Sequence, residues 1–200
     1  MDDHFDPRRR LLCLLLIIIT LVTFWQVRGH DFVNLDDNLY VYENLHIRDG
    51  LTWEGIKWAF CVGILFESPH ADYWQPVTWL SRMIDIQFWG LNPSGHHLMN
   101  LVIHVFNTLL LFHVLRRMTG SLEKSAWVAA FFAVHPLHVE SVAWVTERKD
   151  VLSCFFWMLT IWAYLRYVEL ARIFHISDQD SVGQAAPPAV SWRQRGPLPY

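Results

Sequence analysis

The sequence predicts an all-α membrane protein with about four transmembrane helices and further amphipathic helices in a long first outer loop. Of the 200 residues, 53% are hydrophobic and 11 are tryptophan, and the apolar residues fall in long blocks. Blocks of this kind are typical of a membrane protein rather than a soluble globular domain. The net charge of −3 gives no indication of a nucleic-acid partner.

The first predicted span covers residues 11–27, after a cytoplasmic N-terminus of residues 1–10 that contains three consecutive arginines. At about 1.5 Å per residue, this segment nearly crosses a hydrocarbon core of about 30 Å. A cleaved signal peptide shares the charged start and the apolar stretch, but it also needs small residues at a cleavage site. Because that site is missing and Trp25 closes the segment, the sequence favours an uncleaved anchor.

Three more apolar segments predict spans at residues 97–115, 125–146 and 151–170. The second of these is broken by Pro136, which is tolerated where the break lines a cavity or lies at the interface. Basic residues flank the spans on one side, which the positive-inside rule makes cytoplasmic. The N-terminus and a flexible tail of residues 173–200 are therefore expected in the cytoplasm. The loop 28–96 and the VTERKD loop are expected on the outer face.

The outer loop is expected to contain two amphipathic helices. Residues 52–66 begin with Thr52 as a helix cap and carry Glu54 in the first turn. Residues 76–89 start with a proline, stop before a glycine, and keep Arg82 and Asp85 on one face. The opposite face of that helix presents Val77, Leu80, Met83, Ile84 and Phe88. Such helices lie in the membrane interface.

Two adjacent carboxylates, Asp36 and Asp37, lie in the polar turn of FVNLDDNLYV soon after the first span. A pair of aspartates in a turn is most often solvated or capping. It can also supply a general base or share a divalent metal. No further motif supports a metal, and the three cysteines have no zinc-ligand spacing. We therefore expect no cofactor, and the residues alone leave the pair between capping and catalysis.

A polar stripe follows the span 97–115, because His97, Asn100, His104 and Asn107 fall on one side at 3.6 residues per turn. Such a stripe faces other helices or a wet cavity rather than lipid. Hydrogen bonding between helices is one interpretation, and a role for His97 in substrate binding is another. A haem would need paired histidines on facing helices, and no further motif supports it.

The stretch HPLHVESVAWVTERKD, residues 135–150, places ionisable residues between two apolar spans. Its spacing differs from the HExxH motif of zinc proteases. Arg148 and Lys149 lie on the outer side, where basic residues are normally sparse. In one interpretation Glu147, Arg148, Lys149 and Asp150 neutralise one another in an ordinary loop. In the other, the two cations bind an anion such as a lipid phosphate.

Three blocks carry a resemblance to a known family: FVNLDDNLYV, YWQPVTWLSRMIDIQFWGLNPSGHHLMNLVIHVFNTLLLFHVL and HPLHVESVAWVTERKDVLS. In this order they resemble the membrane region of the multi-pass tetratricopeptide-repeat proteins related to the animal transmembrane O-mannosyltransferases, which are GT-C glycosyltransferases. The resemblance runs from about residue 28 to residue 168. It implies an enzyme that moves a sugar, expected to be mannose, from a polyprenyl-phosphate carrier to an acceptor hydroxyl. The acceptor is expected to be a protein serine or threonine on the outer face.

The resemblance also implies roles for individual residues. An acidic residue in the first outer loop is essential in the GT-C class, which makes Asp36 the expected base and Asp37 the residue that orients it or the acceptor. Arg148 and Lys149 are expected to bind the phosphate of the carrier. The other residues expected to line the site are His97, His135, His138, Glu140, Glu147 and Asp150.

The extent of the chain departs from the family pattern. Proteins of this family have more spans and a following array of helical repeats, so this chain is expected to be the N-terminal part of a longer protein. The enzymatic activity is expected of the full-length protein, and a fragment alone can be inactive. A non-catalytic multi-pass interaction or scaffold subunit is the alternative, in which the polar stripe and ERKD serve helix contacts.

Overall fold

The computed structural model describes residues 6–65 and 73–185, with side chains described as far as Arg172. All regular secondary structure in these ranges is helical, which confirms the predicted class. The chain divides into two compact units, Met1–Trp162 and Ala163–Tyr200. All the candidate site residues belong to the first unit, and the described part of the second is the continuation of one helix, α8 (Arg148–Ala185).

Three segments among the described residues are long and apolar enough to cross a membrane: Pro7–Gly29, Pro93–Thr119 and Val145–Arg172. The first joins α1 (Pro7–Phe24) to a 3-10 turn, η1 (Trp25–Gly29), and the second is α5 (Pro93–Thr119). The third begins with the 3-10 turn η3 (Val145–Glu147) and continues into α8. These segments contain the predicted spans 11–27, 97–115 and 151–170.

The ends of α1 and α5 follow from local sequence. The side chain of Asp6 accepts a hydrogen bond from the backbone N–H of Arg8 at 2.9 Å, and Asn92 caps α5 through the N–H of Ser94 at 3.1 Å. Such caps satisfy backbone donors that a helix start leaves unpaired. At its other end α5 stops at Gly120, whose φ of 68° suits a residue without a side chain.

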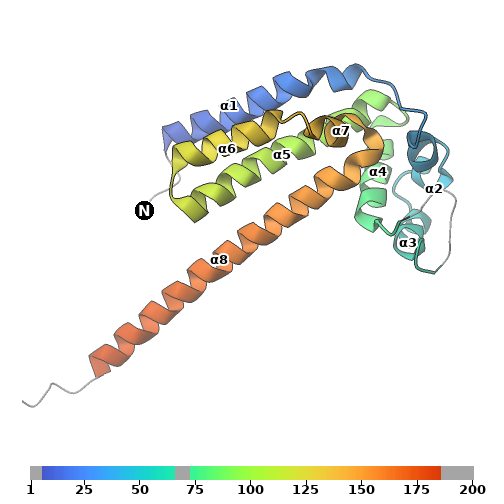
Figure 1. Ribbon diagram of the computed structural model, residues 1–200. Coiled ribbons are helices and arrows are strands. Elements are labelled where there is room, and N and C mark those ends of the chain that lie inside the picture. Colours follow the sequence, from blue (N-terminus) through green and yellow to red (C-terminus); the bar gives the residue numbers. More distant parts are fainter. Residues whose placement is uncertain (1–5, 66–72, 186–200) are drawn as a thin grey trace, which may run out of the picture. The chain divides into compact units, whose positions relative to one another are not determined.

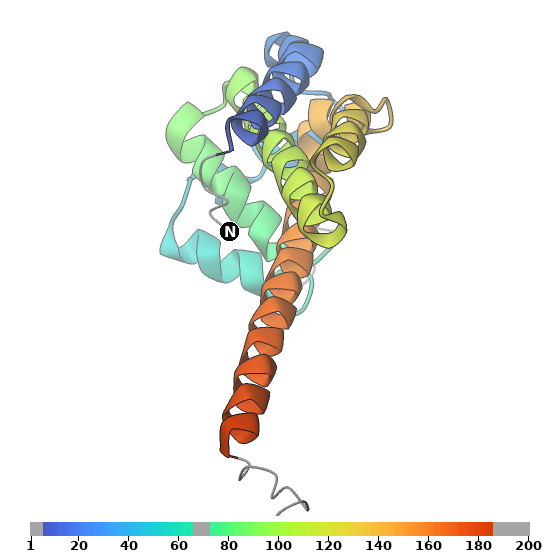
Figure 2. The same ribbon diagram turned by 90° about the vertical axis from the view of Figure 1, so that its left-hand side faces the viewer.

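Helices α1, α5 and α6 (Leu122–Val134) lie side by side in both views (Figures 1 and 2). Their shared core contains Leu16, Phe112, Ala126 and Ala129. Alanines on α6 allow the helix backbones to approach closely, as in other membrane bundles. With 13 residues α6 is about 20 Å long, which is shorter than a hydrocarbon core of about 30 Å.

The segment 125–146 is divided at the predicted place. Helix α6 ends at Val134, a turn contains Pro136, and a short helix α7 (His138–Ala143) leads to η3. The backbone N–H of His138 bonds to the carbonyl of His135 at 3.0 Å, which closes the turn. Both helical pieces contact α1 and α5, and the turn at Pro136 separates them.

The outer segment folds around three aromatic rings. It contains the π-helical turn η2 (Asn38–Tyr42), α2 (Leu45–Arg48), α3 (Trp53–Cys61) and α4 (Pro76–Trp89). Tyr40 stacks on Trp79 with ring centroids 5.4 Å apart, and Trp58 meets Trp79 edge-on at 5.3 Å. Thr52 caps α3 as expected, by accepting a hydrogen bond from the N–H of Gly55 at 3.0 Å. The helix expected over residues 52–66 ends at Cys61.

Helix α4 has the predicted bounds, but its polar face is turned into the protein. In an interfacial helix with this pattern, Arg82 and Asp85 would face water, whereas both are fully buried. Part of the apolar face is outward, since Val77, Ile84 and Phe88 are exposed, whereas Met83 is fully buried in the core. An apolar outer face suits contact with lipid, while the buried charges need partners inside the protein. Those partners connect α4 to the candidate site.

Candidate functional site

The Asp36–Asp37 turn lies against the VTERKD segment. Asp37 is fully buried, and its Oδ1 accepts hydrogen bonds from the backbone N of Thr146 at 3.0 Å and from Thr146 Oγ1 at 2.5 Å. Its Oδ2 accepts a third from the N–H of Val33 at 2.8 Å. The two regions that the sequence expects on one face are therefore joined directly. Asp37 has the contacts of a residue that holds the loop in place.

Asp36 differs from its neighbour in having no such partners. It is half-buried, and its carboxylate makes no hydrogen bond or ion pair with the described part of the chain. Its backbone carbonyl accepts a hydrogen bond from the N–H of Tyr40 at 3.0 Å, which fixes the main chain at the start of η2. Asp36 therefore combines a positioned backbone with a carboxylate that is available to accept a proton.

Arg82 connects α4 to both of these segments. Its guanidinium donates to the carbonyl of Tyr40 at 3.2 Å and to the carbonyl of Thr146 at 2.8 Å. Burial lowers the pKa of Arg82 to about 9, and the nearby charge of Arg148 lowers it as well, while Asp37 opposes the shift. The guanidinium remains charged at neutral pH, so Asp37 and Arg82 form opposite charges on the two sides of Thr146.

Arg148 is buried rather than displayed in a loop. Its Nη1 contacts Asp85 Oδ2, its Nε donates to Asn100 Oδ1 at 2.7 Å, and its Nη2 donates to the carbonyl of His96 at 2.8 Å. Each guanidinium nitrogen thus has a protein partner, and the side chain is 0% exposed. The interpretation in which Arg148 is neutralised by its own loop is wrong, because its partner comes from α4. The predicted phosphate-binding role gains no support from this position.

Lys149 and its acidic neighbours follow the ordinary-loop interpretation more closely. Lys149 Nζ lies 2.6 Å from Glu147 Oε1, with the lysine side chain 38% exposed. Asp150 is exposed and accepts a hydrogen bond from Ser141 Oγ at 3.2 Å. Lys149 is therefore the cation of this stretch that a ligand can reach, once its partly exposed ion pair with Glu147 opens.

The HPLH turn contributes one ring to the protein interior. His138 is half-buried, with its ring centroid 4.4 Å from Phe132 and 5.2 Å from His104. His135 and Glu140 are exposed. Within residues 6–65 and 73–172, none of these three side chains has a hydrogen bond or ion pair to Asp36 or Asp37. Their predicted role in lining the site remains a prediction.

The polar stripe of α5 is buried along its length, which confirms the interhelical interpretation for three of its members. Asn100 Nδ2 donates to the carbonyl of Trp144 at 3.0 Å, and Asn107 Nδ2 to the carbonyl of Val151 at 2.9 Å. His104 Nε2 lies 3.1 Å from the carbonyl of Ala133, at the end of α6. The carbonyls of Ala133 and Trp144 lie where α6 and α7 end, so Asn100 and His104 satisfy backbone groups at the broken part of the chain, while Val151 lies in the first turn of α8.

His97 is the exception in the stripe. It is fully buried, yet neither ring nitrogen makes a hydrogen bond of normal geometry with the described residues. Its ring lies edge-on to His30, with centroids 5.9 Å apart. His30 is exposed and belongs to the segment that leads from α1 to the Asp36–Asp37 turn. His97 therefore lies beneath the candidate site, and its substrate-binding role stays a prediction.

Sequence reasoning missed Arg82, Asp85 and Thr146 as parts of this site. Arg82 and Asp85 are three residues apart on a helix that is apolar on its other side. In a membrane protein, two ionisable residues on one helix face are themselves a signal that the face is buried against protein. Thr146 carries no comparable signal, because its role depends on hydrogen bonds to Asp37, which is distant in the sequence.

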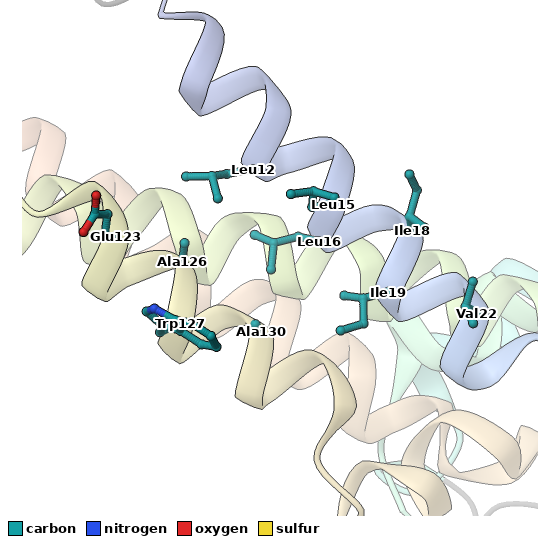
Figure 3. Close-up of a pocket in the computed structure, with 10 residues that line it drawn as sticks. All are labelled: Leu12, Leu15, Leu16, Ile18, Ile19, Val22, Glu123, Ala126, Trp127 and Ala130. Carbon is teal, nitrogen blue, oxygen red and sulfur yellow. The ribbon is translucent and has the colours of Figure 1, made fainter.

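An apolar groove of about 540 Å³ lies between α1 and α6, apart from these residues (Figure 3). Residues of α1 line one wall and residues of α6 the other, and Glu123 is the charged residue at one end. The full set is Leu12, Leu15, Leu16, Ile18, Ile19, Val22, Glu123, Ala126, Trp127 and Ala130. The groove has the apolar character expected of a lipid-facing surface.

No cluster of three or more His, Cys, Asp or Glu that suits a metal ion occurs in the part of the chain that the structure describes. The sequence also allows a divalent metal shared by Asp36 and Asp37. Asp37 directs its two oxygens to Val33 and Thr146, so a shared ion would have to compete with those donors.

The fold and the buried charge network define a multi-pass helical membrane protein in which the segment between the first two candidate spans is joined to the start of the third. No protein-family model and no solved structure matches the chain. The chain is 31% identical over 158 residues to protein O-mannosyl-transferase Tmtc2 of Drosophila melanogaster, which covers 78% of this chain and 17% of that protein.

Two mammalian relatives give the same result. Identity is 31% over 172 residues with protein O-mannosyl-transferase TMTC1 of Mus musculus, covering 82% of this chain and 17% of that protein. It is 30% over 168 residues with protein O-mannosyl-transferase TMTC1 of Homo sapiens, covering 80% and 18%. Over about four fifths of its length the chain is thus similar to proteins named protein O-mannosyl-transferases, and it is an integral membrane protein. It spans less than a fifth of the length of these relatives.

Proposed function

We propose that this chain is the N-terminal part of a membrane glycosyltransferase that moves mannose from a polyprenyl-phosphate carrier to a serine or threonine hydroxyl of a protein. The transfer takes place on the outer face, with the N-terminus in the cytoplasm. The relatives named protein O-mannosyl-transferases support the reaction class. The observation that carries the proposal is the contrast within the aspartate pair, where Asp37 is fully engaged and Asp36 is not.

Asp36 acts as the general base in this proposal. Its carboxylate takes the proton of the acceptor hydroxyl while the hydroxyl oxygen forms a bond to the anomeric carbon of mannose. The bond between that carbon and the phosphate oxygen breaks, and the polyprenyl phosphate leaves with the electron pair. Asp37 holds the turn through Thr146, so that the Asp36 carboxylate stays in place during the reaction.

The negative charge that develops on the leaving phosphate needs a cation. Arg148 contributes through structure, because its contacts with Asp85 and Asn100 hold the start of α8 against α4 and α5. Lys149 is the cation of the ERKD stretch that a phosphate can reach, by exchange with Glu147. The Lys149–Glu147 pair is partly exposed, and pairs of this kind cost little to separate.

The test is the Asp36→Asn variant of the protein encoded by the complete reading frame. Asparagine has nearly the same shape but cannot accept the proton, so transfer of labelled mannose should fall by at least about a hundredfold. Binding of the polyprenyl-phosphate mannose should be unchanged. Near-normal turnover with saturating donor would show that Asp36 is not the base.

A non-catalytic interaction or scaffold subunit is the second candidate, and one observation favours it. The charges of Asp37, Arg82, Asp85 and Arg148 are all buried and all have partners in the fold. A scaffold needs this network but does not need a free Asp36 carboxylate. Exchanging the charges of Asp85 and Arg148 should then restore function lost in either single variant, and Asp36→Asn should have no effect.

A further inference from the structure

The outer end of the first span carries an exposed cation that sequence reasoning did not consider. Arg28 lies in η1, and its guanidinium stacks on the ring of Trp25 at 4.4 Å from the ring centre. The guanidinium makes no hydrogen bond or ion pair with residues 6–65 or 73–172, although the Arg28 carbonyl accepts one from Ser94 Oγ. Its N–H donors are therefore available to a ligand, in contrast to those of Arg148.

Arg28 lines a pocket of about 690 Å³ between η1 and the start of α5. Trp25, Trp89 and Leu98 form its apolar part. Gln26, Asn92 and Ser94 supply polar groups beside the guanidinium. The pocket is open to its surroundings, and its mixed apolar and polar lining can accept a group larger than a single phosphate.

The pocket lies where a membrane-anchored ligand would present its polar end. The first span ends at Gly29 and the second begins at Pro93, and residues on both sides of this boundary line the pocket. Tryptophan and arginine at a span end are typical of the level of the lipid headgroups. A ligand whose chain remains in the bilayer can therefore place a phosphate at Arg28.

The same segment of chain leads from the pocket to the candidate base. Between Arg28 and Asp36, the ring of His30 packs on His97 at 5.9 Å and the ring of Phe32 on His96 at 5.4 Å. These contacts fix the segment over the first turns of α5. The pocket and the Asp36–Asp37 turn are thus two ends of one anchored loop.

We propose that this pocket binds the phosphate and sugar of the polyprenyl-phosphate donor, an assignment that rests on the proposed function. The guanidinium of Arg28 binds the phosphate, since its planar fork matches two phosphate oxygens, and it takes the place of Lys149 as the main cation for that group. The indole rings of Trp25 and Trp89 form walls for the sugar, and Gln26 supplies an amide to its hydroxyls. An ordinary anionic phospholipid needs only the cation, whereas the donor also uses the rest of the pocket.

The assignment is tested by direct binding, without turnover. The protein encoded by the complete reading frame, in phosphatidylcholine nanodiscs, is titrated with labelled polyprenyl-phosphate mannose. Arg28→Gln should raise the Kd by about tenfold or more, as expected for loss of a charged hydrogen-bonding partner. Arg48→Gln is the matched control, because Arg48 is also an exposed arginine of the outer segment but does not line the pocket. The control should keep the Kd of the parent chain.

Two further arms separate the sources of the phosphate. Arg28→Lys keeps the charge but loses the planar fork, so it should weaken binding less than Arg28→Gln. Phosphatidylglycerol added in excess to the nanodiscs should leave donor binding unchanged. Displacement of the donor by phosphatidylglycerol, equal Kd values for Arg28→Gln and Arg48→Gln, or no binding to the parent chain would each overturn the assignment.

The experiment also distinguishes this assignment from the proposed reaction. Asp36→Asn should bind the donor with the Kd of the parent chain, because Asp36 does not line the pocket. If Arg28→Gln loses binding while Asp36→Asn retains transfer, the donor pocket stands and the base is elsewhere. If Arg28→Gln binds normally while Asp36→Asn loses transfer, the base stands and the donor pocket is elsewhere.

Discussion

Thr146 donates two hydrogen bonds to a single carboxylate oxygen of Asp37, from its backbone N at 3.0 Å and from its Oγ1 at 2.5 Å. Both residues are buried, and they lie 109 residues apart in the sequence. The carbonyl of Thr146 accepts a hydrogen bond from Arg82 at 2.8 Å, so one short turn receives both a carboxylate and a guanidinium. This turn is the point at which the outer segment is held against the beginning of α8.

The first prediction concerns the hydroxyl of Thr146. Thr146→Val keeps the side-chain shape and the backbone donor but removes Oγ1–H, leaving a buried carboxylate with one partner fewer. Hydrogen bonds to charged groups contribute about 1.5–3 kcal/mol, so the free energy of unfolding should fall by about that amount. Denaturant titration in detergent measures the change. Thr23→Val is the control, since Thr23 is exposed on α1, and an equal loss in both variants would contradict the prediction.

The second prediction separates the two aspartates by stability. Asp37→Asn places an amide NH₂ where one carboxylate oxygen faces an N–H donor, so it should lower the free energy of unfolding by about 1–3 kcal/mol. Asp36→Asn should leave it within about 0.5 kcal/mol, because no protein partner is lost. Thermal unfolding of the two purified variants provides the comparison. For mannose transfer by the folded protein the order should be the reverse, with Asp36→Asn the more harmful change, because Asp36 is the proposed base.

The third prediction concerns the buried pair of Asp85 and Arg148. Removing one partner leaves an unpaired buried charge, so Arg148→Met should cost about 3–5 kcal/mol. Replacing both, as in Asp85→Leu with Arg148→Met, should recover most of that loss because neither charge remains. The partly exposed pair of Glu147 and Lys149 gives the control, and Glu147→Gln or Lys149→Met should each cost about 1 kcal/mol or less. A double variant as unstable as Arg148→Met would show that the pair does not act as a unit.

Part of this fold could be predicted because membrane helices are recognised in a sequence by their long apolar runs. The runs that became α1 and α5, the break at Pro136 and the cap at Thr52 each follow from a local rule about length, proline or hydrogen-bond donors. The buried stripe on α5 follows from periodicity alone, since polar residues on one side of a span must face protein. These features require no knowledge of what packs against them.

The rest depends on partners that are distant in sequence. Arg148 lies beside three ionisable residues of its own loop, and nothing local indicates that it instead turns toward Asp85 on α4. The sequence also could not show which face of α4 is buried. The same amphipathic pattern fits a helix with its polar side in water and a helix with its polar side against protein. The aspartate pair shows a similar limit, since only the fold distinguishes the bonded Asp37 from the free Asp36.

The last prediction concerns the close packing of Gly95 and Trp89 at the pocket that contains Arg28. A Cβ added at Gly95 would lie 2.3 Å from Trp89 Cγ and 2.6 Å from Trp89 Cβ, so Gly95→Ala must displace the indole. Overpacking of this kind costs about 1–3 kcal/mol, and it should also weaken donor binding because Trp89 forms a wall of the pocket. Gly29→Ala is the matched control, since Gly29 lines the same pocket but an added Cβ there meets nothing within 4 Å. Thermal unfolding and donor titration of the two variants give the measurement. If Gly95→Ala matched Gly29→Ala in both, Trp89 would not be packed against α5 as the structure shows, and it would not form a fixed wall for the sugar.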